Sequence, residues 1–194
     1  MFMSQGNKKN KIAIIGHTRG IGKAIADLYQ KKNYSIVGMS SSNGYDLQFS
    51  QVEIMEQLDD CRLIVINAYV GGGQMTLLKR IYGKYLFENK KVVVITSTSG
   101  TPIGADEELG NPEYRDYCKN KKILIGYIEE LQQELFNKPL SIYDVCPDVV
   151  DTDMTKGLWE DLPKLKADEV AEAVRYCFES TFNVNKIVMQ KNVK

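Results

Sequence analysis

The stretch that decides the fold is KIAIIGHTRGIGKAIADLY, from Lys11 to Tyr29. An apolar run ends at Gly16, and Gly20 and Gly22 follow directly before a segment of helical periodicity. Glycine permits a tight turn and lets the backbone approach a ligand without a Cβ in the way. A helix that begins there presents unpaired N–H groups and a positive dipole end, which suit a pyrophosphate. The glycine spacing does not fit a P-loop, so the stretch predicts a strand–turn–helix cradle of another kind.

Short β-branched runs alternate with helical patterns along the rest of the chain. Most runs are continuously apolar, which is typical of strands buried on both faces of a parallel sheet. The alternation predicts an α/β fold of the Rossmann type: a doubly wound, mostly parallel seven-stranded sheet with helices on both faces, in a single domain over residues 1–194. The loop 98–112 is long and rich in glycine and acidic residues, which predicts a functional or mobile segment. The expected strands are 11–15, 34–39, 45–47, 62–67, 91–97, 140–146 and 186–190, and the expected helices are 22–31, 51–58, 75–87, 113–136 and 167–182.

Composition excludes several classes of partner. The 194 residues include 25 Lys and Arg and 25 Asp and Glu, so the formal net charge is zero. This balance gives no electrostatic footprint for nucleic acid or an anionic membrane, and no apolar run approaches the roughly 20 residues of a membrane span. The four cysteines form no CxxC pair, which favours reduced, mostly buried thiols over disulfides or a zinc site. We therefore expect a cytoplasmic protein that binds no metal.

The end of the second expected strand indicates which dinucleotide the turn would hold. NAD-binding folds place Asp or Glu about 20 residues after the glycines, where it binds the ribose 2′-OH. Here Ser40 and Ser41 stand at that place, and Arg19 in the turn is suited to bind a second phosphate group. We therefore expect NADP rather than NAD, although Asp46, the nearest carboxylate, keeps NAD open. His17, the only histidine, has no cluster of ligands near it in the sequence and is expected to be a solvated loop side chain.

A second constellation is YCKNK, in which Tyr117 precedes Lys121 by four residues. On a helix these two side chains share a face. A phenol with a pKa near ~10 is a poor acid–base catalyst at neutral pH, and an adjacent ammonium would lower that pKa by stabilising the phenolate. Such a pair is expected by chance at this composition, so it gains weight only from the segments around it.

Those segments occur in a characteristic order: IGHTRGIGKAIA (15–26), INAY (66–69), VVVITSTSG (92–100), YCKNKKILIGYIEELQQEL (117–135) and DVCPDVVDTDMT (144–155). Together they cover nearly the whole chain and resemble the motifs of the short-chain dehydrogenase/reductase family, of which this chain would be a shortened member. The resemblance implies an oxidoreductase that interconverts a carbonyl and an alcohol by hydride transfer with NADP(H).

The resemblance also implies roles for particular residues. Tyr117 would be the general acid or base, Lys121 would lower its pKa and hold the nicotinamide ribose, and Ser97 would bind the substrate oxygen. Asn67 and Ala68 would line the adenosine ribose. Asp46 and Leu47 would lie at the adenine, and Thr152 at the nicotinamide carboxamide or pyrophosphate. The cofactor-binding residues that the resemblance and the turn together imply are Gly16, Thr18, Arg19, Gly20, Ile21, Gly22, Ser40, Ser41, Asp46, Leu47, Asn67, Ala68, Tyr117, Lys121, Val150 and Thr152.

Several departures from the family pattern favour an alternative. The family's catalytic asparagine has no clear counterpart, since Gln74 is the only amide between Asn67 and Asn89. Tyr69 and Asp148 stand where the family has glycine. These departures are typical of a catalytically silent dinucleotide-binding sensor or partner protein with the same fold, which remains the second hypothesis.

The expected partners are a small carbonyl or alcohol substrate and further copies of the chain. The substrate segment around 153–166 is short, and Leu158, Trp159 and Leu162 could form a small apolar lid or pack as a helix face. The family resemblance implies a homodimer or homotetramer packed through the helix that carries Tyr117, where Ile125, Tyr127 and Ile128 could serve either an interface or the core.

Overall fold

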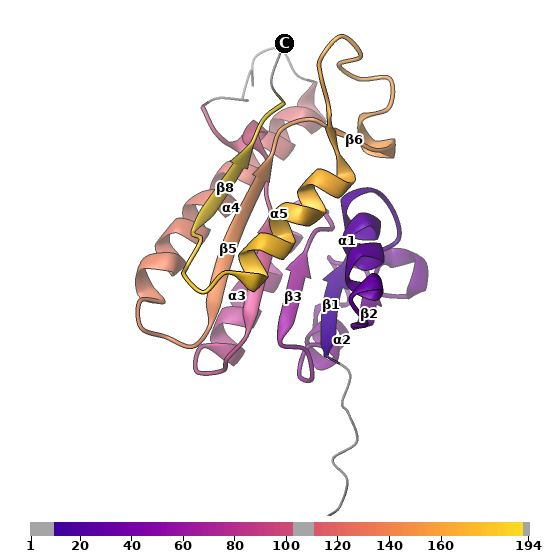
Figure 1. Ribbon diagram of the computed structural model, residues 1–194. Coiled ribbons are helices and arrows are strands. Elements are labelled where there is room, and N and C mark those ends of the chain that lie inside the picture. Colours follow the sequence, from indigo (N-terminus) through magenta and orange to yellow (C-terminus); the bar gives the residue numbers. More distant parts are fainter. Residues whose placement is uncertain (1–9, 103–110, 192–194) are drawn as a thin grey trace, which may run out of the picture.

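A computed structural model describes residues 10–102 and 111–191, so the middle of the predicted loop 98–112 lies outside the described residues. Six parallel strands form one sheet in the order β2-β1-β3-β4-β5-β8 (Figure 1). They are β1 (Lys11–Ile15), β2 (Ser35–Met39), β3 (Leu63–Ile66), β4 (Lys91–Ile95), β5 (Ser141–Pro147) and β8 (Lys186–Met189). The predicted α/β class with a doubly wound parallel sheet is confirmed.

Helices cover both faces of this sheet (Figure 1). One core lies under α1 (Gly20–Lys31) and α5 (Ala167–Glu179) and includes Ile12, Val65 and Val145. The other lies under α2 (Gln51–Gln57), α3 (Gly73–Tyr85) and α4 (Pro112–Glu134). Because the strands are buried on both faces, their side chains feed the two cores alternately, and this accounts for the continuously apolar runs.

The seventh predicted strand, at residues 45–47, does not form. The chain turns back after β2 through a short 3₁₀ segment, η1 (Ser41–Asn43), and Gly44 has a φ of 91°. The Asp46 carboxylate then accepts hydrogen bonds from the backbone N–H groups of Gln48 (2.7 Å) and Phe49 (3.2 Å). Such a local turn competes with an extended strand. The main sheet therefore has six strands, and β2 is its edge.

A second, two-stranded sheet was not predicted. Val150 of β6 (Val150–Asp151) pairs with Leu165 of β7 (Leu165–Lys166), and both side chains are buried. This ladder closes the base of the predicted substrate segment, which begins with the 3₁₀ turn η3 (Asp153–Thr155). The loop from 152 to 164 is thereby fixed at the upper right of Figure 1.

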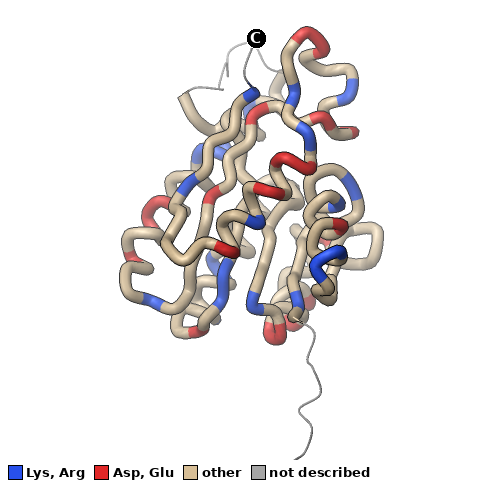
Figure 2. Tube along the Cα trace, in the orientation of Figure 1, with Lys and Arg blue, Asp and Glu red and all other residues tan. Residues whose placement is uncertain are grey.

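Other expectations concern single side chains. Ile125 and Ile128 belong to the core, so they are not available for an interface. All four cysteines are buried and no disulfide joins them, as the sequence predicts. Positive and negative residues are interspersed over the chain in Figure 2, in line with the zero net charge. In the part of the chain that the structure describes, no helix has both the length and the apolar character to cross a bilayer.

The turn between β1 and α1 depends on close backbone contact. A Cβ on Gly22 would lie 1.9 Å from the carbonyl oxygen of Gly16, and one on Gly16, whose φ is 90°, would lie 2.8 Å from the nitrogen of Ala68. The Gly16 N–H donates to the carbonyl of Met39 at 2.6 Å. These contacts join the carboxyl ends of β1, β2 and β3 to the start of α1.

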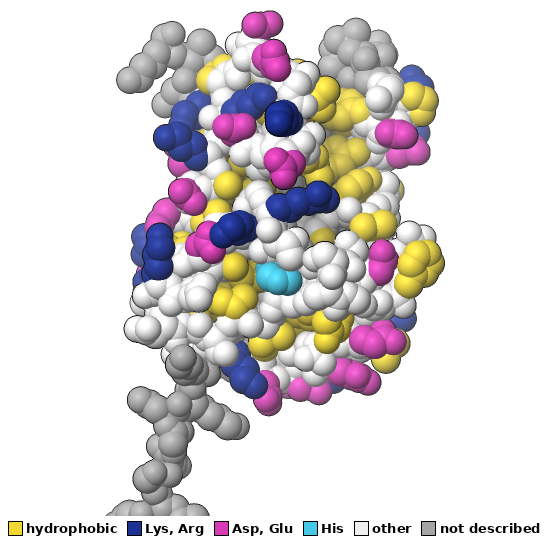
Figure 3. All heavy atoms as spheres, turned by 90° about the vertical axis from the view of Figure 1, so that its right-hand side faces the viewer, with side chains coloured by type: hydrophobic (Ala, Val, Ile, Leu, Met, Phe, Trp, Pro, Cys, Tyr) yellow, Lys and Arg dark blue, Asp and Glu magenta, His cyan; other side chains and the backbone are white. Residues whose placement is uncertain are grey.

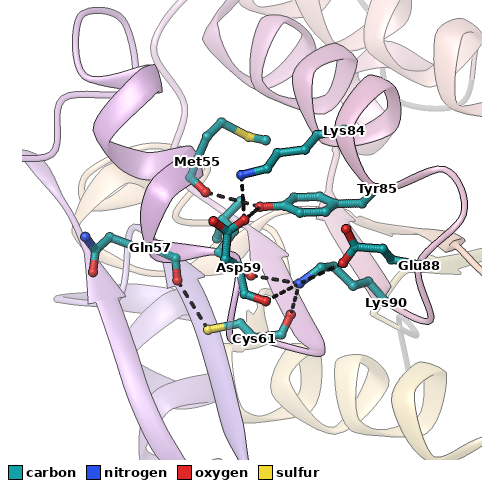
Figure 4. A network of polar contacts seen from close by, with 9 residues as sticks. Met55, Gln57, Asp59, Cys61, Lys84, Tyr85, Glu88 and Lys90 are labelled. Atoms are coloured by element: carbon teal, nitrogen blue, oxygen red, sulfur yellow. Dashed lines mark hydrogen bonds and ion pairs between the residues drawn. The ribbon is translucent and has the colours of Figure 1, made fainter.

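At the amino ends of the strands, the buried ammonium of Lys90 holds the segment between α2 and β3 (Figure 4). Lys90 is 4% exposed, and its Nζ donates to the carbonyls of Leu58 (2.9 Å), Asp59 (2.8 Å) and Cys61 (3.0 Å). Its Nζ also lies 4.4 Å from the ring centroid of Tyr85. These carbonyls follow the last turn of α2, where orphan acceptors and the negative dipole end favour a cation.

Replacing Lys90 by methionine should destabilise the protein by about 2 kcal/mol or more, because two buried carbonyls and one partly buried carbonyl would lose a charged donor. The matched control is Lys84→Met, which removes an exposed ion pair with Asp59 and should change the free energy of unfolding by no more than about 0.5 kcal/mol. Urea denaturation measures both. Equal losses would show that Lys90 contributes no more than a surface charge.

Alanine substitutions at Gly22 and Gly83 should change stability in opposite directions. Gly22→Ala should cost at least about 2 kcal/mol, because its Cβ would overlap the Gly16 carbonyl. Gly83 lies inside α3 with open space around its Cβ position, so Gly83→Ala should gain about 0.5–1 kcal/mol from helix propensity. The same unfolding measurement checks both, and a neutral Gly22→Ala would contradict the close contact.

Candidate active site

The residues predicted to form the cradle lie together at the carboxyl edge of the sheet. The Asn67 side chain donates from Nδ2 to the Gly16 carbonyl at 2.9 Å, and the backbone N–H groups of Asn67 and Ala68 both donate to the carbonyl of Ile15. A Cβ on Gly20 would meet Cγ2 of Thr152 at 3.1 Å, so Thr152 lies against the first residue of α1. The N-terminal end of α1 therefore lies next to the ends of β1 and β3 and the start of the 152–164 loop.

His17 is only partly the solvated loop side chain that the sequence predicts, since its exposure is intermediate. Its ring lies over Gly38 of β2, where a Cβ would come within 2.3 Å of it. Its Nδ1 is buried and has no hydrogen-bond partner among the described residues. Figure 3 shows this face, with the histidine in cyan and basic side chains in dark blue gathered above it. The missing side chain at Gly38 makes room for the ring, which the sequence pattern did not reveal.

The polar end of β2 is organised by Asn43. Ser40 is buried; its hydroxyl and its N–H both donate to Oδ1 of Asn43, at 3.0 and 2.7 Å, and Asn43 donates to the Gly38 carbonyl at 2.9 Å. Ser41 and Arg19 are exposed, and Arg19 is the residue directly before α1. Exposed hydroxyl and guanidinium groups thus lie at the end of β2 and at the start of α1, while the Ser40 hydroxyl is already hydrogen-bonded.

The other predicted cofactor residues are less directly placed. Asp46 uses its carboxylate within its own turn, and the Leu47 side chain is buried against Gly73 in the core under α2–α4. The Leu47 side chain therefore does not face an adenine, whereas Asp46 is partly exposed and uses one carboxylate oxygen in its turn. Thr18 is exposed, Ile21 packs partly on the core under α1 and α5, and Val150 is buried on β6.

The predicted catalytic residues come from β4 and α4. The sequence starts α4 with an N-cap, since Oδ1 of Asn111 accepts a hydrogen bond from the Tyr114 N–H at 2.8 Å and Pro112 follows. Ser97 precedes the short 3₁₀ turn η2 (Thr98–Gly100). A Cβ on Gly100 would lie 2.7 Å from the backbone carbon of Lys121, so this glycine lets α4 pack directly on η2.

Tyr117 lies in a row of aromatic rings. The ring of Tyr69 meets it edge-on with centroids 4.8 Å apart, and Tyr114 stacks on it at 6.3 Å. Trp159, from the 152–164 loop, lies 5.8 Å from Tyr114 and has a left-handed φ of 49°. The hydroxyl of Tyr69 accepts a hydrogen bond from Nδ2 of Asn120 at 3.3 Å. Tyr69 therefore fills space beside Tyr117 that a glycine would leave open.

Lys121 is buried directly beneath this row. Its Nζ donates to Oε1 of Gln74 at 2.7 Å and to the carbonyl of Ile95 at 2.9 Å. The same Nζ lies 5.4 Å from the Tyr69 ring centroid and 5.5 Å from that of Tyr117. The ammonium is thus held between neutral oxygens and aromatic faces.

Burial controls the protonation of both groups. Burial raises the pKa of Tyr117 to about 12, although the Ser97 hydroxyl acts in the other direction. Burial also lowers the pKa of Lys121 from 10.5 to about 7, against a smaller opposing effect of Asp144. In the free protein, burial outweighs the lowering of the phenol pKa that the sequence predicts from Lys121. The neutral phenol is the form that can give a proton to a carbonyl oxygen.

Sequence reasoning missed four polar or aromatic residues of this region. Gln74 is one, although it was the only amide in its interval and opens α3 after a run of glycines. Asn120 and Tyr114 stand three residues from Tyr117 on α4, and this helical spacing could have identified them. Asp144 is 1% exposed on β5 and accepts a hydrogen bond from the Thr96 hydroxyl, and a carboxylate inside an apolar strand is the signal that was overlooked.

Two further observations bear on what this site can hold. Asp148, where the family has glycine, accepts a hydrogen bond from the Thr98 hydroxyl at 2.9 Å and so ties the end of β5 to η2. No group of three or more His, Cys, Asp or Glu that could hold a metal ion occurs within residues 10–102 and 111–191. The arrangement combines a phenol, a hydroxyl and an ammonium next to a phosphate cradle, which suits proton transfer to an oxygen beside a bound dinucleotide.

Comparison with known proteins points to one family, although no family model matches the sequence. The chain is 24% identical to the 3-oxoacyl-[acyl-carrier-protein] reductase of Vibrio harveyi in an alignment of 201 positions that covers 80% of each chain. It is 26% identical to the 3-oxoacyl-[acyl-carrier-protein] reductase of Rattus norvegicus in an alignment of 223 positions that covers 91% of this chain and 94% of the rat protein.

Solved structures show the same fold. A short-chain dehydrogenase from Burkholderia cenocepacia, crystallised with NADP, aligns with a TM-score of 0.73 at 13% identity, over 94% of this chain and 89% of that one. The 3-ketoacyl-(acyl-carrier-protein) reductase of Brucella melitensis, crystallised with NADH, aligns with a TM-score of 0.73 at 14% identity, over 92% of this chain and 96% of that one. The glycine turn and the order of the motifs resemble those of the short-chain dehydrogenase/reductase family, and in sequence and in fold the chain is similar to proteins of that class.

Proposed function

We propose that this protein is an NADP(H)-dependent oxidoreductase that interconverts a carbonyl and an alcohol on a small molecule. The observation that carries the proposal is the packing of Ser97, Tyr117 and Lys121 against one another at the edge of the sheet where the glycine turn opens. Relatives named as carbonyl and 3-oxoacyl reductases support the same class of reaction.

The glycine turn fits a dinucleotide. Side chains at Gly16 and Gly22 would collide with neighbouring backbone atoms, and one at Gly20 would crowd Thr152, so glycines let α1 begin close to the end of β1. The N-terminal end of such a helix offers unpaired N–H groups that suit a phosphate. Asn67, Ala68 and Thr152 lie against the same turn and would hold the cofactor together with it. The cofactor would supply the hydride chemistry, and the protein would supply position and electrostatics.

Two residues would act on the substrate oxygen. The Tyr117 phenol, kept protonated by burial, would give its proton to the oxygen when a carbonyl is reduced and take it back when an alcohol is oxidised. Ser97 would donate a hydrogen bond to the oxygen as negative charge develops there. The ammonium of Lys121 would stabilise the phenolate that proton transfer leaves behind.

The preference for NADP rests on Arg19 and the serines at the end of β2. The exposed guanidinium of Arg19, directly before α1, is suited to a 2′-phosphate. Ser41 offers an exposed hydroxyl next to Ser40, whose own hydroxyl is bonded to Asn43. Solved relatives were crystallised with NADP in one case and with NADH in another, so the argument for NADP rests on this chain's own residues.

Thermal unfolding with NADPH, NADP⁺, NADH and NAD⁺ should show selective stabilisation by the phosphorylated pair. A ligand at 100 times its Kd stabilises a fold by about 2.7 kcal/mol. Arg19→Gln should weaken NADPH binding by about tenfold, the loss of one charge-assisted contact, and leave NADH unchanged. Lys23→Gln is the matched control, because Lys23 lies one turn further along α1 and pairs with Asp27 at 2.6 Å. Equal shifts with all four dinucleotides would contradict the NADP preference.

Carbonyl reduction should depend on Tyr117 and slow as the pH rises through about 7. The lowered pKa of Lys121 means that its ammonium is present below about pH 7 and is lost above it, and with it the charge that stabilises the phenolate. Steady-state rates on a panel of carbonyl compounds measure this profile. Tyr117→Phe should abolish turnover, and Lys121→Met should give a low rate that no longer falls across this pH range.

The second candidate is a dinucleotide-binding protein without turnover. It is favoured by Tyr69, whose ring occupies space against Tyr117, and by Asp148 in place of a glycine. Binding of NADPH without Tyr117-dependent reduction of any carbonyl would favour this candidate. Turnover at an ordinary enzymatic rate, roughly 1–10³ s⁻¹, would exclude it.

A further inference from the structure

We propose that Gln74 is a positioning residue whose side-chain carbonyl holds the amine of Lys121 beneath Tyr117. Its catalytic consequence rests on the proposed function, but the interaction between the two side chains does not. Gln74 stands at the second residue of α3, and Lys121 is 47 positions further along the chain in the middle of α4.

The orientation of the Gln74 amide is fixed by its other contacts. Nε2 donates to the carbonyls of Ile66, at the end of β3, and Ile95, at the end of β4, at 3.3 and 3.2 Å. Since the amide nitrogen faces these two acceptors, the amide oxygen must face Lys121, and the Oε1–Nζ distance is 2.7 Å. Gln74 and Lys121 are 2% and 3% exposed, so water does not compete for this hydrogen bond.

The carbonyl of Ile95 joins the two side chains into one unit. It accepts hydrogen bonds from both Nε2 of Gln74 and Nζ of Lys121. Ile95 is the last residue of β4, two positions before Ser97, so the same strand end sets the positions of the lysine and the serine. Gln74 thereby fixes Lys121 relative to the strand that carries Ser97.

Few groups influence the protonation state of the Lys121 amine. The rings of Tyr69 and Tyr117 face its Nζ from the segment before α3 and from α4. The acidic group Asp144 and the thiol of Cys146 on β5 favour its charged form through space, and burial opposes them. The described residues provide no carboxylate within ion-pair distance of Nζ. Gln74 is thus the one side chain that accepts a hydrogen bond from this amine in the described structure.

This arrangement makes a sharp prediction for two substitutions of opposite effect. Gln74→Glu replaces a neutral acceptor by a carboxylate, which favours the charged amine, so Lys121 should titrate about 1 pH unit higher or more. Gln74→Met has a similar size and no acceptor, so Lys121 should titrate lower than in the wild type. A general loss of packing cannot move the titration in opposite directions.

The experiment is NMR titration of protein labelled with ¹³C at the lysine ε-carbon, without cofactor. The Lys121 signal is assigned by its disappearance in Lys121→Met. Gln51→Met is the matched control, because Gln51 is also a buried glutamine whose Nε2 donates to two carbonyls, those of Leu47 and Gly73, and it is not bonded to Lys121. The control should titrate as the wild type does.

Unchanged titration of Lys121 in both Gln74 variants would overturn the proposal, as would shifts in the same direction. If Gln74→Met does not fold, Gln74→Glu decides alone: an upward shift absent from Gln51→Met supports the proposal, and no shift overturns it.

Kinetics give the second readout. Gln74→Met should lower kcat about tenfold or more through loss of the lysine's position, with a smaller change in the KM for the carbonyl. Gln74→Glu should move the slowing of carbonyl reduction to higher pH, by the same amount as the NMR shift. Failure of the wild type to reduce any carbonyl would count against the proposed function alone, whereas the titration would still decide whether Gln74 holds Lys121.

Discussion

The contact between Gly22 and the carbonyl of Gly16 is the constraint on which the rest of this structure depends. With a Cβ position only 1.9 Å from that oxygen, only glycine lets α1 start this close to the end of β1. The same Gly16 residue accepts from the Asn67 amide through its carbonyl and donates to Met39 through its N–H, so three strand ends converge on one turn. Backbone atoms make most of these contacts.

The shortened chain keeps its cores although β2 forms the edge of the sheet. Residues 45–47 turn back instead of extending, and Leu47 fills the core against Gly73. Gln51, at the start of α2, donates to the carbonyls of both Leu47 and Gly73, so the segment 45–47 is tied to the start of α3. Lys90 secures the other end of α2 by donating hydrogen bonds to the carbonyls of Leu58 and Asp59, which directly follow the helix. Side-chain hydrogen bonds to backbone carbonyls thus stabilise both ends of a helix of only seven residues.

The sequence predicted most of what depends on local pattern, and it failed at one local turn and where a distant residue decides. The β-branched runs of β1, β3 and β4 and the glycine turn are local signals, whereas Asn67 and Ala68 were expected only from the family resemblance. The strand at 45–47 was wrong because the Asp46 carboxylate bonds the next backbone N–H groups. The burial of one side of the His17 ring was not predicted, because it depends on Gly38, 21 positions away, which leaves room for the ring. Gln74 was set aside because its partner is 47 residues distant, and only the packing of α3 against α4 reveals it.

Burial of Tyr117 and Lys121 makes the choice of amide over carboxylate at position 74 consequential. A carboxylate beside a buried ammonium would favour its charged form, and an apolar side chain would leave the amine without its acceptor. A neutral carbonyl lies between these extremes, at a place where burial lowers the pKa of Lys121 to about 7. The charged and neutral forms of this lysine are therefore close in free energy, so the choice between an amide and a carboxylate at position 74 decides which form predominates near neutral pH.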